Sequence, residues 1–90
     1  MNEREAQDKI RRGQHAERLL KDPLMVEVID GMKRTVFHNI ETSNYKDIDE
    51  REDLYKMLQA INAFEKDLKQ RIQGGVKAKS VLEKLFSKGE

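Results

Sequence analysis

The chain has 90 residues, of which 39% are charged and 37% hydrophobic, with 18 basic residues against 17 acidic ones and no cysteine. This composition excludes a disulfide-stabilised domain and a thiolate metal site. The near balance of charge argues against a dedicated nucleic-acid module, whose pI usually exceeds about 9. A chain this short buries only roughly 60–65% of its unfolded surface, so oligomerisation is a common remedy for its marginal stability.

Residues 1–21 predict a charged helical arm. Their few apolar side chains stand among charges of mixed sign, and Gly13 weakens the middle of the helical pattern. We expect Leu19 and Leu20 to pack against the rest of the chain. The first dozen residues need not pack, and their order is left open.

The pair Asp22–Pro23 predicts the start of a second helix. Proline is favoured at the first helical position and aspartate is a strong N-cap. Apolar residues at helical spacing then continue to Ile40, so we expect a helix over about residues 23–40.

Residues 41–49 predict a loop, because Thr, Ser, Asn and Asp dominate them. Two overlapping capping boxes, Asp47 with Glu50 and Asp49 with Glu52, predict the start of the next helix. A wide apolar stripe then continues over about residues 48–73, and Gly74–Gly75 predicts its end. Methionines 25, 32 and 57 are interpreted as core filling on the inner stripes.

The last segment, residues 75–90, predicts a short amphipathic helix that is too short to be stable alone. The expected fold is therefore all-α: an antiparallel αα-hairpin core over residues 22–74, with the N-terminal arm and the short C-terminal helix attached. The C-terminal helix must lie on its own hairpin or on another chain. Its candidate partner-binding residues are Val81, Leu82, Leu85 and Phe86.

No catalytic, cofactor or metal motif is present. Neither His15 nor His38 has the i+3 or i+4 partner of a helical metal site. The acidic run at residues 47–53 lacks the ligand spacing of a calcium loop, and Gly74–Gly75 lacks the surroundings of a phosphate loop. We therefore expect a non-enzymatic protein without cofactor, metal or small-molecule substrate. No apolar run reaches a membrane span, so we expect it to be soluble.

Parts of the chain resemble a group of small helical proteins of unassigned function encoded by tailed bacteriophages and prophages. The first stretch is AERLLKDPLMVEVIDGM, and the second is DIDEREDLYKMLQAINAFEKDLKQRIQGGVKA. They match that group's motifs AxxLLxDPL and DxxxREkLwxML, with Tyr55 where the group usually has tryptophan. The resemblance covers roughly residues 16–78. It implies a fold and a phage setting, in the host cytoplasm or the virion, and it implies no active site.

These observations favour an accessory or structural factor of phage head assembly or packaging, which self-associates as a homo-oligomer or docks on a larger phage protein. One alternative is a nucleic-acid-contacting packaging protein of small-terminase type. Its candidate contacts in the basic C-terminal third are Lys66, Lys69, Arg71, Lys77, Lys79 and Lys84. Another alternative is a small inhibitor that binds a host protein. Phosphate contacts would weaken steeply with salt, which distinguishes them from apolar docking.

Overall fold

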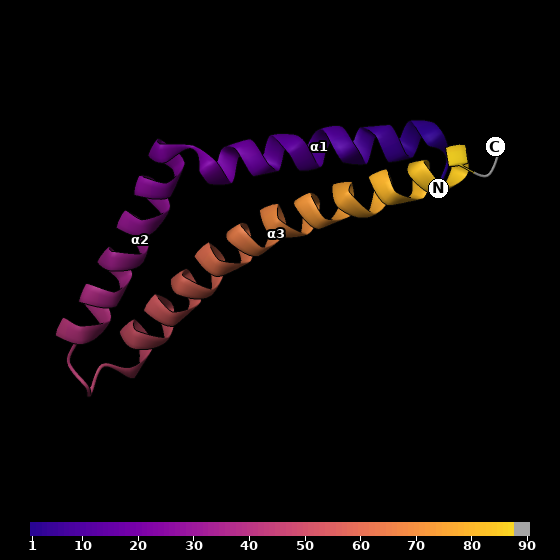
Figure 1. Cartoon of the computed structure of the whole chain (residues 1–90). Helices are drawn as coiled ribbons and strands as arrows, with labels where there is room; N and C mark the ends of the chain where they lie inside the picture. Colours follow the sequence, from indigo (N-terminus) through magenta and orange to yellow (C-terminus); the bar gives the residue numbers. More distant parts are fainter. Residues whose placement is uncertain (88–90) are drawn as a thin grey trace.

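The computed structural model describes residues 1–87, which form three α-helices (Figure 1). They are α1 (Glu3–Lys21), α2 (Pro23–Thr42) and α3 (Ile48–Ser87). The all-α prediction is confirmed over this part of the chain. The three helices join through a single residue between α1 and α2 and a five-residue loop between α2 and α3.

The start of α2 shows why the chain bends at Asp22. The residue before a proline is pushed out of the helical region, and Asp22 has an extended backbone with ψ of 123°. Its carboxylate accepts hydrogen bonds from the backbone N–H groups of Leu24 at 2.9 Å and Met25 at 3.1 Å. The predicted cap-and-proline start is confirmed, and α1 and α2 meet there at an elbow (Figure 1).

The loop covers residues 43–47, within the predicted 41–49, and α3 begins at Ile48, as the predicted helix over about 48–73 requires. Helix α2 continues to Thr42, and Ser43 closes it with a side-chain hydrogen bond to the Ile40 carbonyl at 2.7 Å. Asp47 accepts the backbone N–H of Glu50 at 3.2 Å and caps α3, as predicted. The second predicted capping box is wrong, because Asp49 already lies inside α3.

Helix α3 runs for 40 residues and passes straight through Gly74–Gly75. The predicted helix end at residue 73 and the separate C-terminal helix over residues 75–90 are therefore wrong; residues 88–90 of that prediction lie outside the described part. A glycine that ends a helix adopts the left-handed conformation. No glycine among the described residues has positive φ. Packing against α1 keeps this segment helical.

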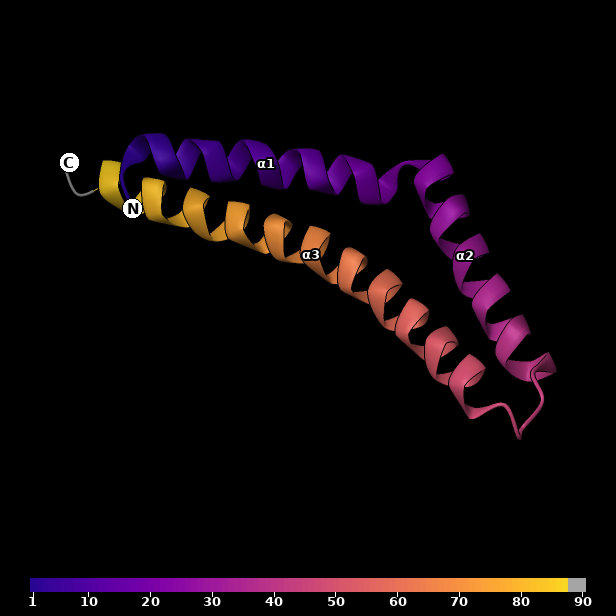
Figure 2. The ribbon, with the colours of Figure 1, turned by 180° about the vertical axis from the view of Figure 1, so that it is seen from behind.

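After the loop, α3 turns back and lies first beside α2 and then beside α1 (Figures 1 and 2). The chain measures 68 × 25 × 15 Å, so it is long and only about two helices thick. Every large side chain consequently keeps some contact with solvent over residues 1–87. The packing of a single copy is confined to one seam.

That seam follows one row of α3. Its buried and half-buried positions recur every three or four residues, at 51, 54, 58, 61, 65, 68, 72, 75, 78 and 82. This average step of about 3.5 residues is the heptad spacing that keeps one face of a gently supercoiled helix against its neighbours. The same row serves both α2 and α1.

Small residues bring α1 very close to α3. Ala6 and Ala78 are buried with Leu82, and Ile10 packs against this cluster. The first dozen residues therefore contribute to the core, which the charged composition of the arm did not suggest. Alanine and glycine let the two helix backbones approach, and this offsets the small number of large apolar side chains in α1.

Arg51 stands at the loop end of the α3 row. Its Nε atom is buried without a hydrogen-bond partner. We expect Arg51→Leu to raise the free energy of unfolding by about 1 kcal/mol, because an unsatisfied buried donor costs about 1–3 kcal/mol. Urea unfolding followed by circular dichroism measures the change. Lys56→Leu, at an exposed site, is the control and should change little; a less stable Arg51→Leu protein would contradict the prediction.

Candidate interaction surface

Among residues 1–87, no group of three or more histidine, aspartate or glutamate side chains is arranged to hold a metal ion. His15 and His38 are both exposed. No described helix combines the length and the apolar character needed to cross a membrane. The candidate sites on the surface of residues 1–87 are therefore its apolar region and its charged regions.

A groove lies between α2 and α3, with a volume of about 620 Å³. No charged residue lines it. Its lining residues are Gly31, Met32, Thr35, Val36, Met57, Ala60 and Ile61. A charge-free hollow on a chain in which 39% of residues are charged is a clear departure from the surface average.

Exposed apolar side chains extend this groove toward the elbow. Leu24, Val28 and Met32 follow one another at four-residue steps, so they share one side of α2. Phe64 lies two turns beyond Met57 on the same side of α3. All five are exposed. We call the groove and these flanking side chains the α2–α3 apolar face.

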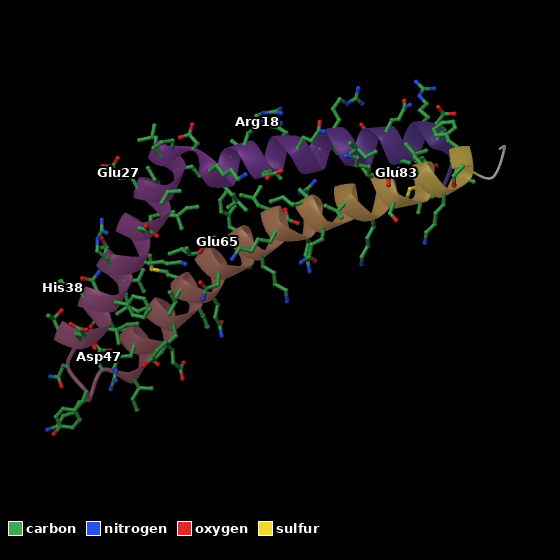
Figure 3. The ribbon with its side chains drawn as sticks, in the orientation of Figure 1. Arg18, Glu27, His38, Asp47, Glu65 and Glu83 are labelled. Carbon is green, nitrogen blue, oxygen red and sulfur yellow. The ribbon has the colours of Figure 1, made fainter. Side chains whose placement is uncertain are left out.

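Several polar and charged side chains of this region lie away from the groove. Glu65 sits on the side of α3 toward α2, whereas Glu27 and His38 lie on the outer side of α2 (Figure 3). Glu65 forms an ion pair with Lys33, the only one among the described residues that joins two helices. Both partners are half-buried, and neither lines the groove. The pair holds α2 to α3 and leaves the groove uncharged.

Charge is divided between the two ends of the molecule. Residues 22–65 carry ten acidic and five basic side chains, a net charge of −5. Residues 1–21 together with 66–87 carry twelve basic and six acidic side chains, a net charge of +6. We call these parts the acidic half and the basic half. The first contains α2 and the loop, and the second contains α1, with α3 running through both (Figure 1).

Two carboxylates of α1 have lowered pKa values. The hydrogen bond from Arg11 lowers the pKa of Asp8, with Arg12 adding to the effect, and the hydrogen bond from Lys21 lowers the pKa of Glu17. Lowered pKa values stabilise the fold above the unfolded-state pKa, and this contribution is lost as the pH falls through the folded-state values. Both groups are on the surface, so the contribution is small.

The four residues predicted to bind a partner do not act as one exposed anchor. Leu82 is only 9% exposed and belongs to the cluster that holds α1. Val81, Leu85 and Phe86 are exposed on the same helix. The segment is therefore already docked on its own chain through Leu82, and only the other three side chains remain available to a partner.

The six basic residues predicted for nucleic-acid contact are all exposed but do not form one stripe. At 100° per residue, Lys66, Lys77 and Lys84 share the outer side of α3, whereas the other three, Lys69, Arg71 and Lys79, spread over its flanks. Arg71 is also paired with Asp67 at 3.0 Å. Nucleic-acid contact stays a prediction, and its residues would engage from several directions.

The apolar face was missed at the sequence level because its methionines were assigned to the core. Met25 is half-buried, but Met32 and Met57 are exposed, the latter 54%. A signal was present in the width of the apolar arc on α2. Val26 and Phe37 lie on one side of the buried Ile29 and Val36, and Leu24 and Val28 lie on the other. One neighbouring helix cannot cover so wide an arc.

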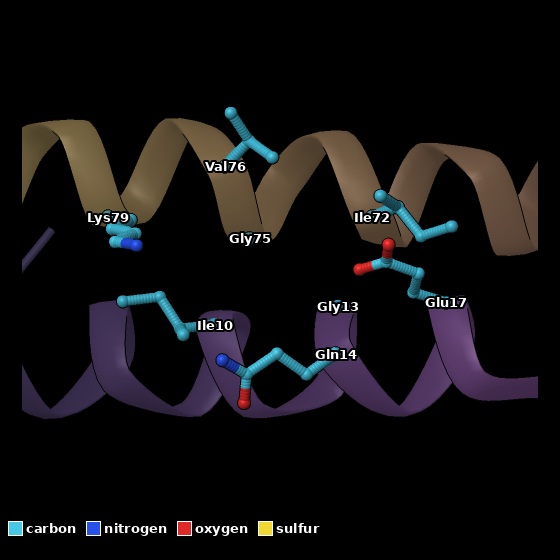
Figure 4. Close-up of a pocket in the computed structure, with 8 residues that line it drawn as sticks. All are labelled: Ile10, Gly13, Gln14, Glu17, Ile72, Gly75, Val76 and Lys79. Carbon is cyan, nitrogen blue, oxygen red and sulfur yellow. The ribbon is translucent and has the colours of Figure 1, made fainter.

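A second, smaller hollow of about 170 Å³ lies beside the crossing of α1 and α3 (Figure 4). It exists because Gly13 and Gly75 face each other without side chains. Glu17 and Lys79 also line it. Its mixed lining follows from the helix crossing and does not resemble a binding site.

No protein-family model, curated protein or solved structure matches the chain. The resemblance to phage-encoded proteins accordingly stays a prediction from the quoted motifs.

Proposed function

We propose that the chain is a non-enzymatic helical interaction protein whose α2–α3 hairpin docks through the apolar face on a protein surface. The charge-free groove between α2 and α3 is the observation that carries this proposal. With the sequence resemblance, it supports a role as an accessory or structural factor of phage head assembly or packaging. The chain would act there by self-association or by docking on a larger phage protein.

The apolar face suits docking energetically. Fully burying a Val, Leu, Phe or Met side chain contributes roughly 1.5–3 kcal/mol. The five large side chains of the face are all partly exposed in the single chain, so covering them contributes several kcal/mol at about 25 cal/mol per Å². They stand on helices that are already formed, which lowers the ordering cost of binding.

This proposal moves the docking element from residues 81–86 to the opposite end of the molecule. Leu82 contributes to holding α1 and is unavailable to a partner, whereas the apolar face has no contact that it would have to give up. An amphipathic helix that lays its apolar face into a hydrophobic groove is a recurrent mode of protein recognition.

Photo-cross-linking tests the proposal. The cross-linkable amino acid p-benzoylphenylalanine is placed at Met32 or Met57, in the cells that naturally produce the protein. We expect a discrete covalent adduct from both positions. Tyr55 is the matched control, since it is 47% exposed and lies on the other side of α3.

The identity of the adduct tests the setting. A capsid, portal or packaging protein, or a second copy of the chain within an assembly particle, supports the phage role. No adduct from either groove position, or an equal yield from Tyr55, would contradict docking through the apolar face. An adduct with a host protein alone would support the inhibitor alternative instead.

A further inference from the structure

We infer that the occupant of the α2–α3 apolar face is a second copy of this chain, which lies antiparallel along the first so that the acidic half of each covers the basic half of the other. The inference rests on the proposed function and names its partner. Three independent features of the structure carry it: the exposed area, the division of charge and two glycines that a single copy does not require.

The single chain exposes far more surface than a compact protein of its size. Its accessible area is 7239 Å². A compact monomer of 10.6 kDa is expected to expose roughly 5,500 Å². The excess is roughly 1,700 Å² per chain, and obligate homodimers bury about 2,000–5,000 Å² from both partners together. The surplus therefore has the size that a stable dimer removes.

The division of charge selects the antiparallel orientation. The acidic half has a net charge of −5 and the basic half one of +6, at opposite ends of a chain 68 Å long. Charges beyond about 8–10 Å are largely screened at physiological salt, so each half interacts mainly with what lies directly against it. A parallel pair would place like charges together along its whole length, whereas an antiparallel pair places opposite charges together.

One side of α3 carries suitable surfaces in both halves. Phe64 of the apolar face is followed seven residues later by Arg71, on the same side of the helix. There a shallow hollow of about 290 Å³, which we call the cationic hollow, is lined by Lys9, Arg12, Gln70, Arg71 and Gly74. The aliphatic stems of Lys and Arg can cover apolar side chains while their charged heads reach acidic residues at the rim.

Two helix-interior glycines, Gly31 in α2 and Gly74 in α3, are not required for close packing within one chain. A Cβ at Gly74 would meet nothing within 4 Å, and one at Gly31 would meet only the end of the Arg34 side chain at 3.9 Å. Glycine lowers helix stability relative to alanine at such positions. Gly31 lines the apolar groove and Gly74 lines the cationic hollow. Close approach of a second copy at both places accounts for them.

The first experiment measures the oligomeric state by sedimentation equilibrium. The wild-type chain is expected to be a dimer of about twice 10.6 kDa. Met57→Lys places a cation opposite the cationic hollow, and Gly74→Leu fills the approach from a position where a Cβ meets nothing within 4 Å in its own chain. Each is expected to raise the dissociation constant at least about 100-fold. Tyr55→Lys, outside the face, should change it by less than about threefold.

The second experiment measures orientation. The chain has no cysteine, so Tyr45→Cys in the exposed loop gives one spin-label site per copy. In an antiparallel dimer the two labels lie at opposite ends, separated by a distance close to the 68 Å length. A separation below half that length would mean a parallel pair and would overturn the inference.

The outcomes separate this inference from the proposed function. A wild-type chain that stays monomeric, while Met57 cross-links to a different protein, overturns the second-copy inference and leaves docking through the apolar face intact. A dimer that tolerates both Met57→Lys and Gly74→Leu also overturns the inference. Circular dichroism of each variant establishes that it is folded, so that loss of the dimer is not loss of the helices.

Discussion

Alanine in place of Gly13 is expected to lower the free energy of unfolding by about 2 kcal/mol, within the range of about 1–3 kcal/mol for overpacked sites. A Cβ there would lie 2.8 Å from the Arg71 carbonyl oxygen and 3.2 Å from the Gly75 Cα. Both are backbone atoms, which cannot turn aside as a flexible side chain can. Helices α1 and α3 must then separate along their closest line of contact.

The matched control is one residue away from the partner glycine. Gly75→Ala would place a Cβ 3.0 Å from the Lys9 carbonyl oxygen and should also destabilise, whereas Gly74→Ala meets nothing within 4 Å. Gly74→Ala should therefore stabilise by up to about 1 kcal/mol through helix propensity. Urea unfolding of each variant in a Met57→Lys background keeps association out of the measurement. Equal effects at positions 74 and 75 would contradict the close contact of α1 with α3.

The second large effect is expected at Leu82. Leu82→Asp removes an apolar side chain from the cluster with Ala6 and Ala78 and places a carboxylate there, so it should cost at least about 3 kcal/mol. Phe86→Asp, at a side chain that is 62% exposed, should change stability by less than about 0.5 kcal/mol.

Thermal unfolding followed by circular dichroism measures both variants. We expect Leu82→Asp to release α1 and to lose helicity well below the melting temperature of the wild-type chain, while Phe86→Asp melts with the wild type. Similar melting of the two variants would show that the end of α3 does not hold α1. Retained stability of Leu82→Asp together with loss of association would return the docking role to residues 81–86.

The parts of the fold that depend on neighbouring residues were predictable from the sequence. The start of α2 follows from the steric effect of Pro23 on Asp22, and the start of α3 follows from one carboxylate and one N–H three residues away. These interactions are complete within four residues of chain. They hold whatever the remainder of the molecule does.

The fate of Gly74–Gly75 was not predictable in that way. Two glycines in sequence favour a helix end locally, but Gly75 faces Gly13, which is far away in sequence. The loss of helix propensity is about 1 kcal/mol per glycine, and close packing of two backbones offsets it. The packing of the first dozen residues stayed open at the sequence level for the same reason. Alanines and glycines count as weakly apolar, so their spacing does not indicate a core.

The apolar face was only partly predictable. The apolar arc of α2 indicated that the helix buries a wide surface, yet spacing alone does not tell how much of that arc α3 covers. Met32 and Met57 therefore looked like core residues and are instead exposed. These side chains are exposed because the molecule is only 15 Å thick. That thickness depends on how all three helices pack together, which the spacing within one helix does not show.

Helix α3 also sets the length of the molecule. Forty residues at a rise of 1.5 Å span about 60 Å, nearly the full 68 Å of the molecule. Helix α3 should bend most easily at the Gly74–Gly75 step, and α1 packs against α3 at that step. Packing of α1 therefore stiffens the molecule along its length. A partner bound at the loop end is held at a fixed distance from a partner bound at the opposite end.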